Sequence, residues 1–269
     1  MKLARAAAVT LCLVQFTVLL GACSTSHPAA HPTPGSSTST STAAAPGTLT
    51  ILASTQLKPA FDQLETQFAA ANPGVSATAT YQGSQALATA VQAGAQGDLF
   101  ATDADPIAAL AAAGAVATAT VQTFARNELE IVVPIGNPKA IQGLQDLANP
   151  GVSVVLADPS LPAGKDAVTA LALAGVKLTP KASVSNVPQL ITAVLSGNAD
   201  AGIAFRSDVV AGGSGVTGVA LPAGNPQETY RIGVLHNAAN AAGASAFVEF
   251  VRSQRGRAIL AAAGFVPAG

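Results

Sequence analysis

The sequence is poor in the residues that most often carry catalysis or crosslinks. Its 269 residues include two cysteines, three histidines and no tryptophan, and aromatic residues make up 4 %. Both cysteines, Cys12 and Cys23, lie near the N-terminus, so the rest of the chain has no thiol for a disulfide or a thiolate site. The fold must therefore rest on a hydrophobic core, and the chain is long enough to build one.

Charged residues are also scarce, at 10 %, and the formal net charge is −1. A balance this close to zero gives no basic surface for nucleic acid or for an anionic membrane, so neither is expected as a partner. His236 is the one histidine beyond the first 47 residues, and no Ser–His–Asp set, Walker loop or GxGxxG loop is present. No cofactor is expected. Gly212–Gly215 is interpreted as a flexible turn.

Three aspartates, Asp98, Asp103 and Asp105, leave a metal site or an acid pair open as a possibility. Asp103 and Asp105 are better explained as caps of a helix that ends at Ala113, with Pro106 in its first turn.

The first 47 residues read as an export leader and a tether. Lys2 and Arg5 precede an apolar stretch too short for a stable membrane span, and residues 1–22 are predicted to be a signal peptide. The small residues before Cys23 resemble a bacterial lipobox, which implies cleavage before Cys23 and its lipidation; an ordinary secretory signal is the alternative. Residues 23–47 form a Ser/Thr/Pro-rich tether that cannot bury enough surface to fold.

From Thr48 onward, short apolar runs alternate with segments of helical periodicity. This alternation predicts an α/β fold with largely parallel sheets covered by helices on both faces. The expected strands are Thr48–Ala53, Val75–Tyr81, Asp98–Ala101, Leu129–Val133, Val152–Leu156, Ala182–Val184, Ala199–Phe205, Val216–Leu221 and Tyr230–Leu235. The expected helices are Leu57–Asn72, Ser84–Ala93, Asp105–Ala113, one after Pro162, Val187–Ser196, Ala241–Val251 and Gln254–Ala263.

The segment Pro159–Lys165 lies between a predicted strand and a predicted helix. A helix that opens at Ala163 and Gly164 presents unpaired backbone N–H groups, which favour an anionic ligand. We expect Gly164 to let a ligand approach the backbone closely. A structural turn is the alternative, since every α/β protein has several such junctions.

Several motifs, in order along the chain, resemble those of the molybdate-binding family of solute-binding proteins that serve ABC importers. They cover essentially the whole region after the tether, and they are Thr50–Ser54, Tyr81–Ala88, Gly97–Asp105, Asn127–Pro134, Ala157–Gly164, Ala201–Asp208 and Gly264–Phe265.

The resemblance implies a type II periplasmic-binding-protein-like fold, in which two mixed sheets flanked by helices form two lobes around a ligand cleft. Residues 48–127 and 230–269 would form the first lobe and residues 128–229 the second. The chain would cross between the lobes near Asn127 and Tyr230, and the lobes would close by a hinge motion about these crossings.

The resemblance also implies a ligand set. Ser84 would donate its hydroxyl and its backbone N–H, with Gly83 permitting a tight turn, and the loop Ser54-Thr55-Gln56 would supply further donors. Ala163 and Val187 would each offer a backbone N–H at the head of a helix. Capping and core packing are the alternative interpretations of Ser84, Asn186 and Val187.

Two positions depart from the family pattern. Gln56 stands where the family usually has Ser or Thr, so either its amide donates or Ser54 or Thr55 takes over. Phe205 stands where a tyrosine is frequent, so one hydroxyl is missing. Arg206 is the candidate to replace it, with a solvent-facing arginine as the alternative.

The sequence therefore predicts an exported lipoprotein, anchored to the outer face of the cytoplasmic membrane, that captures molybdate, tungstate or a similar oxyanion as a monomer and delivers it to an ABC permease. A binder of sulfate or a small organic anion is the nearest alternative. An enzyme on the same bilobal fold is disfavoured by the leader and the missing catalytic set.

Overall fold

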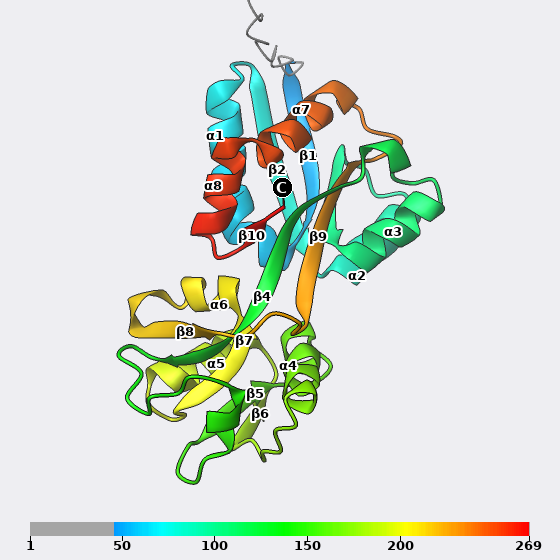
Figure 1. Cartoon of the computed structure of the whole chain (residues 1–269). Helices are drawn as coiled ribbons and strands as arrows, with labels where there is room; N and C mark the ends of the chain where they lie inside the picture. The colour runs from blue at the N-terminus through cyan, green and yellow to red at the C-terminus, as the bar shows by residue number, and fades with distance from the viewer. Residues whose placement is uncertain (1–45, 269) are drawn as a thin grey trace, which may run out of the picture. The chain divides into compact units, whose positions relative to one another are not determined.

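The computed structural model describes residues 46–268, which form two lobes joined by extended strands (Figure 1). Residues 1–45 and 269 lie outside this range, and with them the predicted signal peptide, Cys23 and nearly all of the predicted tether.

The first lobe contains a mixed sheet of strand order β2-β1-β3-β9-β4, with β10 beside β4. Strands β1, β2 and β3 are parallel, whereas β9 runs antiparallel to β3 and β4. The strands are β1 (Gly47–Ser54), β2 (Val75–Gln82), β3 (Leu99–Asp103), β4 (Gln122–Pro134), β9 (Gln227–Val234) and β10 (Val266–Pro267). The helices are α1 (Lys58–Ala71), α2 (Ser84–Gln92), α3 (Ala104–Ala112), α7 (Ala241–Arg252) and α8 (Gln254–Ala262), with 3₁₀ turns η1 (Thr55–Leu57) and η2 (Thr118–Thr120).

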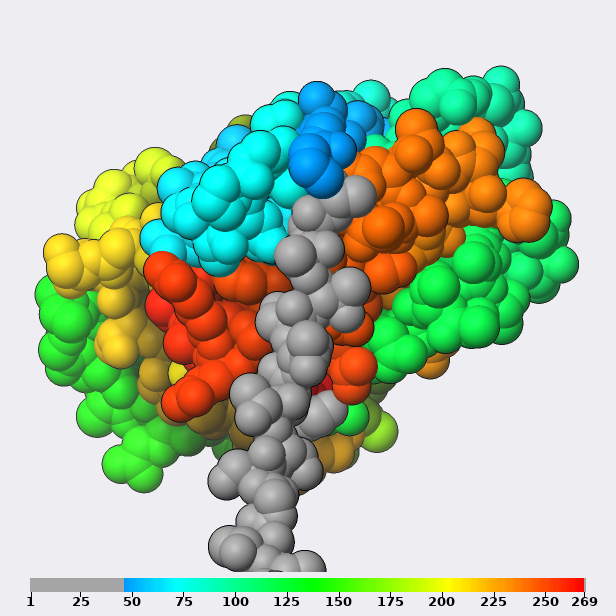
Figure 2. All heavy atoms as spheres, turned by 90° about the horizontal axis from the view of Figure 1, so that it is seen from above, coloured from blue at the N-terminus to red at the C-terminus, as the bar shows by residue number. Residues whose placement is uncertain are grey.

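Aromatic side chains on α1 and α7 hold the core of the first lobe. Phe61 and Phe68 lie on the buried stripe of α1, and the ring of Phe247 from α7 packs against both, at 6.0 and 5.0 Å between centroids. Seen from above, the red and orange C-terminal helices lie beside cyan α1, as expected for these contacts (Figure 2). The C-terminal segment therefore completes the lobe that the N-terminal strands begin.

The second lobe contains β7, β5 and β6 beside β4, with β8 on the other edge of β4. Strands β5, β6 and β7 are parallel to one another, and β7 and β8 are antiparallel to β4. The strands are β5 (Val154–Ala157), β6 (Ala182–Val184), β7 (Ala201–Phe205) and β8 (Val216–Ala220). The helices are α4 (Pro162–Leu173), α5 (Val187–Leu195) and α6 (Arg206–Ala211), with 3₁₀ turns η3 (Leu144–Ala148) and η4 (Gly213–Gly215).

Strand β4 belongs to both sheets. Its first part, Gln122–Glu128, pairs with β9, and its second part, Leu129–Pro134, pairs with β7 and β8. Phe124 is buried in the core of the first lobe, whereas Ile131 is buried in that of the second. The lobes thus have separate hydrophobic cores and share a continuous strand, visible in green beside orange β9 in Figure 1.

The α/β alternation predicted from sequence is confirmed, and three details differ. The sheets are mixed, as the family resemblance implies, rather than largely parallel as the alternation suggests, because β4 and β9 run antiparallel to their neighbours. Strand β4 starts seven residues before the predicted Leu129, at Gln122. Helix α6 is not among the predicted helices, because Ser207 and Asp208, which lie in its first turn, are residues common in turns.

Between residues 46 and 268, no helix has the length and apolar character that crossing a bilayer requires. In the same range, no group of three His, Cys, Asp or Glu side chains is placed to hold a metal ion.

Candidate functional site

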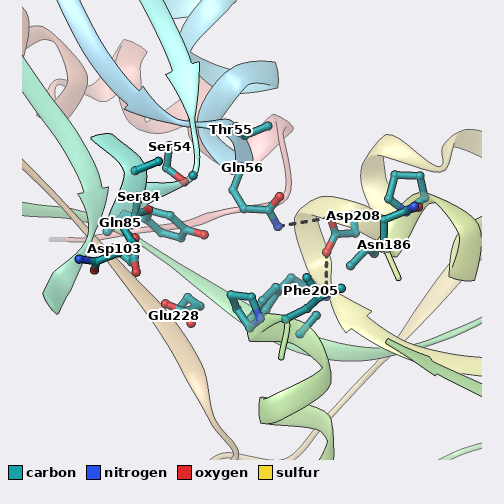
Figure 3. Close-up of a pocket in the computed structure, with 18 residues that line it drawn as sticks. Ser54, Thr55, Gln56, Ser84, Gln85, Asp103, Asn186, Phe205, Asp208 and Glu228 are labelled. Atoms are coloured by element: carbon teal, nitrogen blue, oxygen red, sulfur yellow. Dashed lines mark hydrogen bonds between the residues drawn. The ribbon is translucent and has the colours of Figure 1, made fainter. Parts of the chain in front are cut away.

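A cavity of about 550 Å³ is lined by residues from both lobes (Figure 3). It takes in the loop after β1, the starts of four helices and two residues of β9. The lining residues are Ser54, Thr55, Gln56, Gly83, Ser84, Gln85, Ala86, Asp103, Leu161, Pro162, Ala163, Asn186, Val187, Pro188, Phe205, Asp208, Glu228 and Tyr230.

The N-termini of α2, α4 and α5 meet at this cavity. Helix α2 begins at Ser84 after Gly83, and α4 begins at Pro162 after Leu161, and neither helix has a side-chain cap among the residues described. At α5, the Asn186 side chain accepts a hydrogen bond from the backbone N–H of Gln189 at 3.0 Å, which leaves the first-turn N–H of Val187 available. The first N–H groups of a helix have no intrahelical acceptor, and the helix dipole makes them partly positive.

Hydroxyl groups add further donors. Ser54 ends β1 with 6 % of its surface exposed, Thr55 follows it, and Ser84 opens α2. No hydrogen bond joins any of these three hydroxyls to another residue in the range 46–268, although all three residues line the cavity. Their position at strand and helix ends follows from the sequence, since each comes directly after an apolar strand or a strand–glycine turn.

A hydrogen bond crosses the cavity between the lobes. The Gln56 side-chain amide, from the first lobe, donates to Asp208 Oδ1 at 3.4 Å, and Asp208 Oδ2 accepts the backbone N–H of Phe205 at 3.2 Å (Figure 3). Burial raises the pKa of Asp208 to about 6, partly opposed by these two donors. Gln56 therefore has its amide committed to Asp208 in this arrangement.

Two further carboxyl groups line the cavity, Asp103 at the end of β3 and Glu228 on β9. Burial raises the pKa of Glu228 to about 7, and the negative charge of Asp103 adds to this shift. Tyr230, two residues after Glu228, faces the same cavity, and burial together with the Glu228 charge raises the pKa of its phenol, which stays neutral.

Sequence reasoning missed Asp208, Glu228 and Tyr230 as cavity residues. The alternation of β9 puts Glu228 and Tyr230 on one face, which is a usable signal only after the strand is known to start at Gln227.

Arg206 does not reach the cavity, contrary to one of the two expectations for it. It is the first residue of α6, and its Nε lies 3.9 Å from Glu130 Oε1, with 45 % of its side chain exposed. Strand β7 ends at Phe205, which lines the cavity, and the helix that starts at Arg206 directs the arginine toward Glu130 instead. The described cavity wall contains no lysine, arginine or histidine.

Gly83, which lines the cavity, and Gly164, which follows the lining residue Ala163, have roles that differ from those predicted. A Cβ on Gly164 would lie 2.1 Å from the Asp158 carbonyl oxygen and 2.5 Å from that of Ala157, so this glycine allows the β5–α4 loop to pack on the helix rather than a ligand to approach it. Gly83 has φ −62°, which any residue adopts, and open space around it, so the turn before Ser84 does not require glycine.

Among the remaining acidic candidates, Asp98 has a structural role and Asp103 lacks the one predicted for it. Asp98 accepts the backbone N–H groups of Thr50 and Asn240 at 2.8 and 2.7 Å, which ties β1 to the start of α7. Asp103 precedes α3 but makes no side-chain cap bond there, contrary to its predicted role. His236 is exposed and lies outside the cavity wall, as does Gly212–Gly215, which continues into the 3₁₀ turn η4.

A two-lobed α/β fold with a donor-lined cavity between the lobes is the arrangement typical of solute-binding proteins. Comparison with known proteins agrees: the chain belongs to the family of bacterial extracellular solute-binding proteins, whose model matches residues 49–266. Its relatives are binding proteins of transporters rather than enzymes.

Two similar proteins are molybdate-binding proteins ModA. That of Mycobacterium tuberculosis (strain H37Rv) is 36 % identical over 219 residues, covering 81 % of this chain and 84 % of the relative. That of Escherichia coli (strain K12) is 29 % identical over 234 residues, covering 81 % and 89 %.

Solved structures show the same fold. A substrate binding domain from Clostridium difficile, described as that of a molybdenum ABC transporter, aligns with a TM-score of 0.74 and 26 % identity, covering 82 % of this chain and 99 % of that one. The Azotobacter vinelandii periplasmic molybdate-binding protein aligns with a TM-score of 0.67 and 20 % identity, covering 82 % and 100 %, which is a likeness of fold.

Proposed function

We propose that this protein is the substrate-binding component of an ABC importer and that it captures a tetrahedral oxyanion, molybdate or tungstate. The observation that carries this proposal is the convergence of three helix N-termini and three free hydroxyls on a cavity wall without a cationic side chain. The relatives named for molybdate support the choice of ligand.

Neutral donors suit a dianion that must be released again. Helix N-termini supply partial positive charge and directed N–H groups, so an oxyanion is held without an opposing full charge. A hydrogen bond to a charged group contributes about 1.5–3 kcal/mol, so a few such bonds give tight binding. We assign these bonds to the Ser84 hydroxyl and N–H, the Ala163 and Val187 N–H groups, and the Ser54 and Thr55 hydroxyls.

The two departures from the family pattern receive different roles in this proposal. Gln56 bridges the lobes through Asp208 rather than donating to the anion. Phe205 contributes an apolar wall with 1 % of its surface exposed, and the neutral phenol of Tyr230 is the hydroxyl that the cavity offers in its place.

Closure of the lobes would complete the site. A water molecule takes up about 30 Å³ of liquid, so a cavity of about 550 Å³ holds an oxyanion together with many waters. We propose that residues 48–127 and 230–269 move as one lobe against residues 128–229, with β4 and β9 as the hinge. Such a motion would bring the α4 and α5 N-termini toward Ser84 and expel water.

The cellular setting follows from the leader. We propose that Cys23 carries lipid, that residues 23–47 tether the binding unit to the outer face of the cytoplasmic membrane, and that the closed monomer delivers its ligand to a membrane permease.

Thermal shift against a panel of oxyanions tests the proposal. A ligand present at about 100 times its Kd adds about 2.7 kcal/mol of stability, or roughly 5–11 °C in Tm for a unit of this size. Molybdate and tungstate should give this shift and sulfate a much smaller one. A larger shift with sulfate or an organic anion would reassign the ligand, and no shift with any anion would refute the proposal.

A further inference from the structure

Two carboxyl groups share one face of the sheet at the cavity. Asp103 of β3 lies opposite Tyr230 of β9 in an antiparallel ladder, and Glu228 is two residues before Tyr230 on the same face. Such diagonal neighbours lie within reach of each other's side chains. Both residues line the cavity, and Figure 3 shows them together at one end of it, away from Asp208.

Few hydrogen-bond donors or positive charges near Asp103 and Glu228 offset their negative charge. Oδ1 of Asp103 is buried without a hydrogen-bond partner among the described residues. Asp105 from α3 and Asp166 from α4 add negative charge near Glu228, and Lys165 from α4 is the opposing cation. The neighbouring Tyr230 is neutral, and Asp208 lies across the cavity with two donors of its own.

An oxyanion in this cavity would lie near two carboxylates, Asp103 and Glu228, that accept almost no hydrogen bonds from the protein. A charged pair would repel the ligand, whereas a protonated carboxyl would donate a hydrogen bond to it. The pair therefore favours the ligand only after it has gained a proton.

We propose that Asp103 and Glu228 act as one carboxyl pair that takes up a proton from solvent when the oxyanion binds, and that the neutral carboxyl then donates a hydrogen bond to the anion. The proposal rests on the proposed function, because it requires an anion in the cavity. The step is a transfer of one proton from water or buffer to a carboxylate oxygen, with no change in redox state.

The electrostatics of the empty cavity favour proton uptake by this pair. The pKa of Glu228 is already raised to about 7 by burial and by Asp103, and a bound dianion raises it further. Below this pKa the empty protein already holds the proton, so affinity is independent of pH. Above it, each binding event draws a proton from solution, so Kd rises by up to tenfold per pH unit.

Calorimetric titration of the purified full chain with molybdate tests this. Kd is measured from about pH 5.5 to about pH 8.5, and at the upper end in two buffers with different heats of ionisation. Molybdate kept dilute stays a monomeric dianion over this range, so its own titration does not contribute. The wild-type protein should take up close to one proton per ligand near pH 8.5 and almost none near pH 5.5.

Substitutions of single carboxyl groups identify which of them takes up the proton. Glu228→Gln keeps a hydrogen-bond donor without a titrating group, so it should bind molybdate with a flat pH profile and with tighter affinity than wild type at high pH. Glu249→Gln removes an exposed carboxylate on α7, outside the cavity wall, and should keep the wild-type profile. Asp103→Asn should reduce the proton uptake as well, since the charge of Asp103 helps to raise the pKa of Glu228.

The outcomes are distinguishable. Tight molybdate binding with no pH dependence in the wild type, or uptake lost in Asp208→Asn and retained in Glu228→Gln, would overturn the carboxyl-pair proposal alone. Failure to bind molybdate at any pH would overturn the proposed function as well.

Discussion

Replacing Gly164 by alanine should damage both the stability of the second lobe and the anion site. The new Cβ would lie 2.1 Å from the Asp158 carbonyl oxygen, 2.5 Å from the Ala157 carbonyl oxygen and 2.6 Å from the Asp158 carbonyl carbon. These are backbone atoms, so no side-chain rotation relieves the overlap. Either α4 or the loop after β5 must move by about an ångström or more.

The expected cost follows from this displacement. Overpacking of a well-packed interior typically costs about 1–3 kcal/mol, which corresponds to roughly 2–12 °C in Tm for a unit of 150–250 residues. The same shift carries the N–H of Ala163 away from the cavity. Loss of one hydrogen bond to a charged ligand costs about 1.5–3 kcal/mol, so Kd for molybdate should rise about 10- to 100-fold.

Gly83→Ala provides the matched control. Gly83 precedes α2 at the same cavity, with φ −62° and nothing within 4 Å of the Cβ position. Alanine is a poorer N-cap than glycine, which destabilises the fold, but it also lowers the entropy of the unfolded chain, which stabilises it. The free energy of unfolding should therefore change by less than about 1 kcal/mol. Scanning calorimetry and titration of both variants are the assays. A Gly164→Ala protein with the Tm and affinity of Gly83→Ala would refute the close-packing explanation.

Three further changes have defined outcomes. Ser84→Ala should weaken molybdate binding about 10- to 100-fold in calorimetry at an almost unchanged Tm, and wild-type affinity would remove Ser84 from the site. The pKa of Asp208 is about 6 in the folded protein against a reference of 3.8. Its contribution to the free energy of unfolding is therefore greatest below about pH 4 and is lost as pH rises through 6. Asp208→Asn should remove this component, at most about 3 kcal/mol and less where the cavity admits solvent, and an unchanged profile of Tm against pH would contradict it. Cys23→Ser should release the protein from membranes in a fractionation assay, and retention on the membrane would argue against lipidation.

The elements that sequence predicted best are those with strong periodicity. Helix α1 and strand β2 match expectation closely because Phe61, Leu64 and Phe68 form one apolar stripe and alternation along β2 is regular. Strand β4 was predicted too short because its first part is largely polar. Asn127 is fully buried there, and its side chain donates to the Ser207 hydroxyl at 2.8 Å, a tertiary contact that no local pattern reveals.

In the candidate site too, residues set by local sequence were predicted and residues set by tertiary contacts were not. Seven of the eight predicted ligand residues line one cavity, because residues at the ends of strands and the starts of helices gather where two lobes meet: Ser54, Thr55, Gln56, Ser84, Ala163, Val187 and Phe205. Arg206 differs because Ser207 and Asp208 suit a turn and a helix start equally, and the structure has the helix. The pairing of Asp103 with Glu228 at one end of the cavity was not predicted, since it depends on the register between β3 and β9.

Anomalous diffraction at the molybdenum edge, from crystals grown with molybdate, would locate the bound anion directly. We expect one strong peak in the cavity, with the anion's oxygens about 2.7–3.2 Å from the backbone nitrogens of Ser84, Ala163 and Val187. A peak elsewhere on the protein, or none at a saturating concentration, would contradict it.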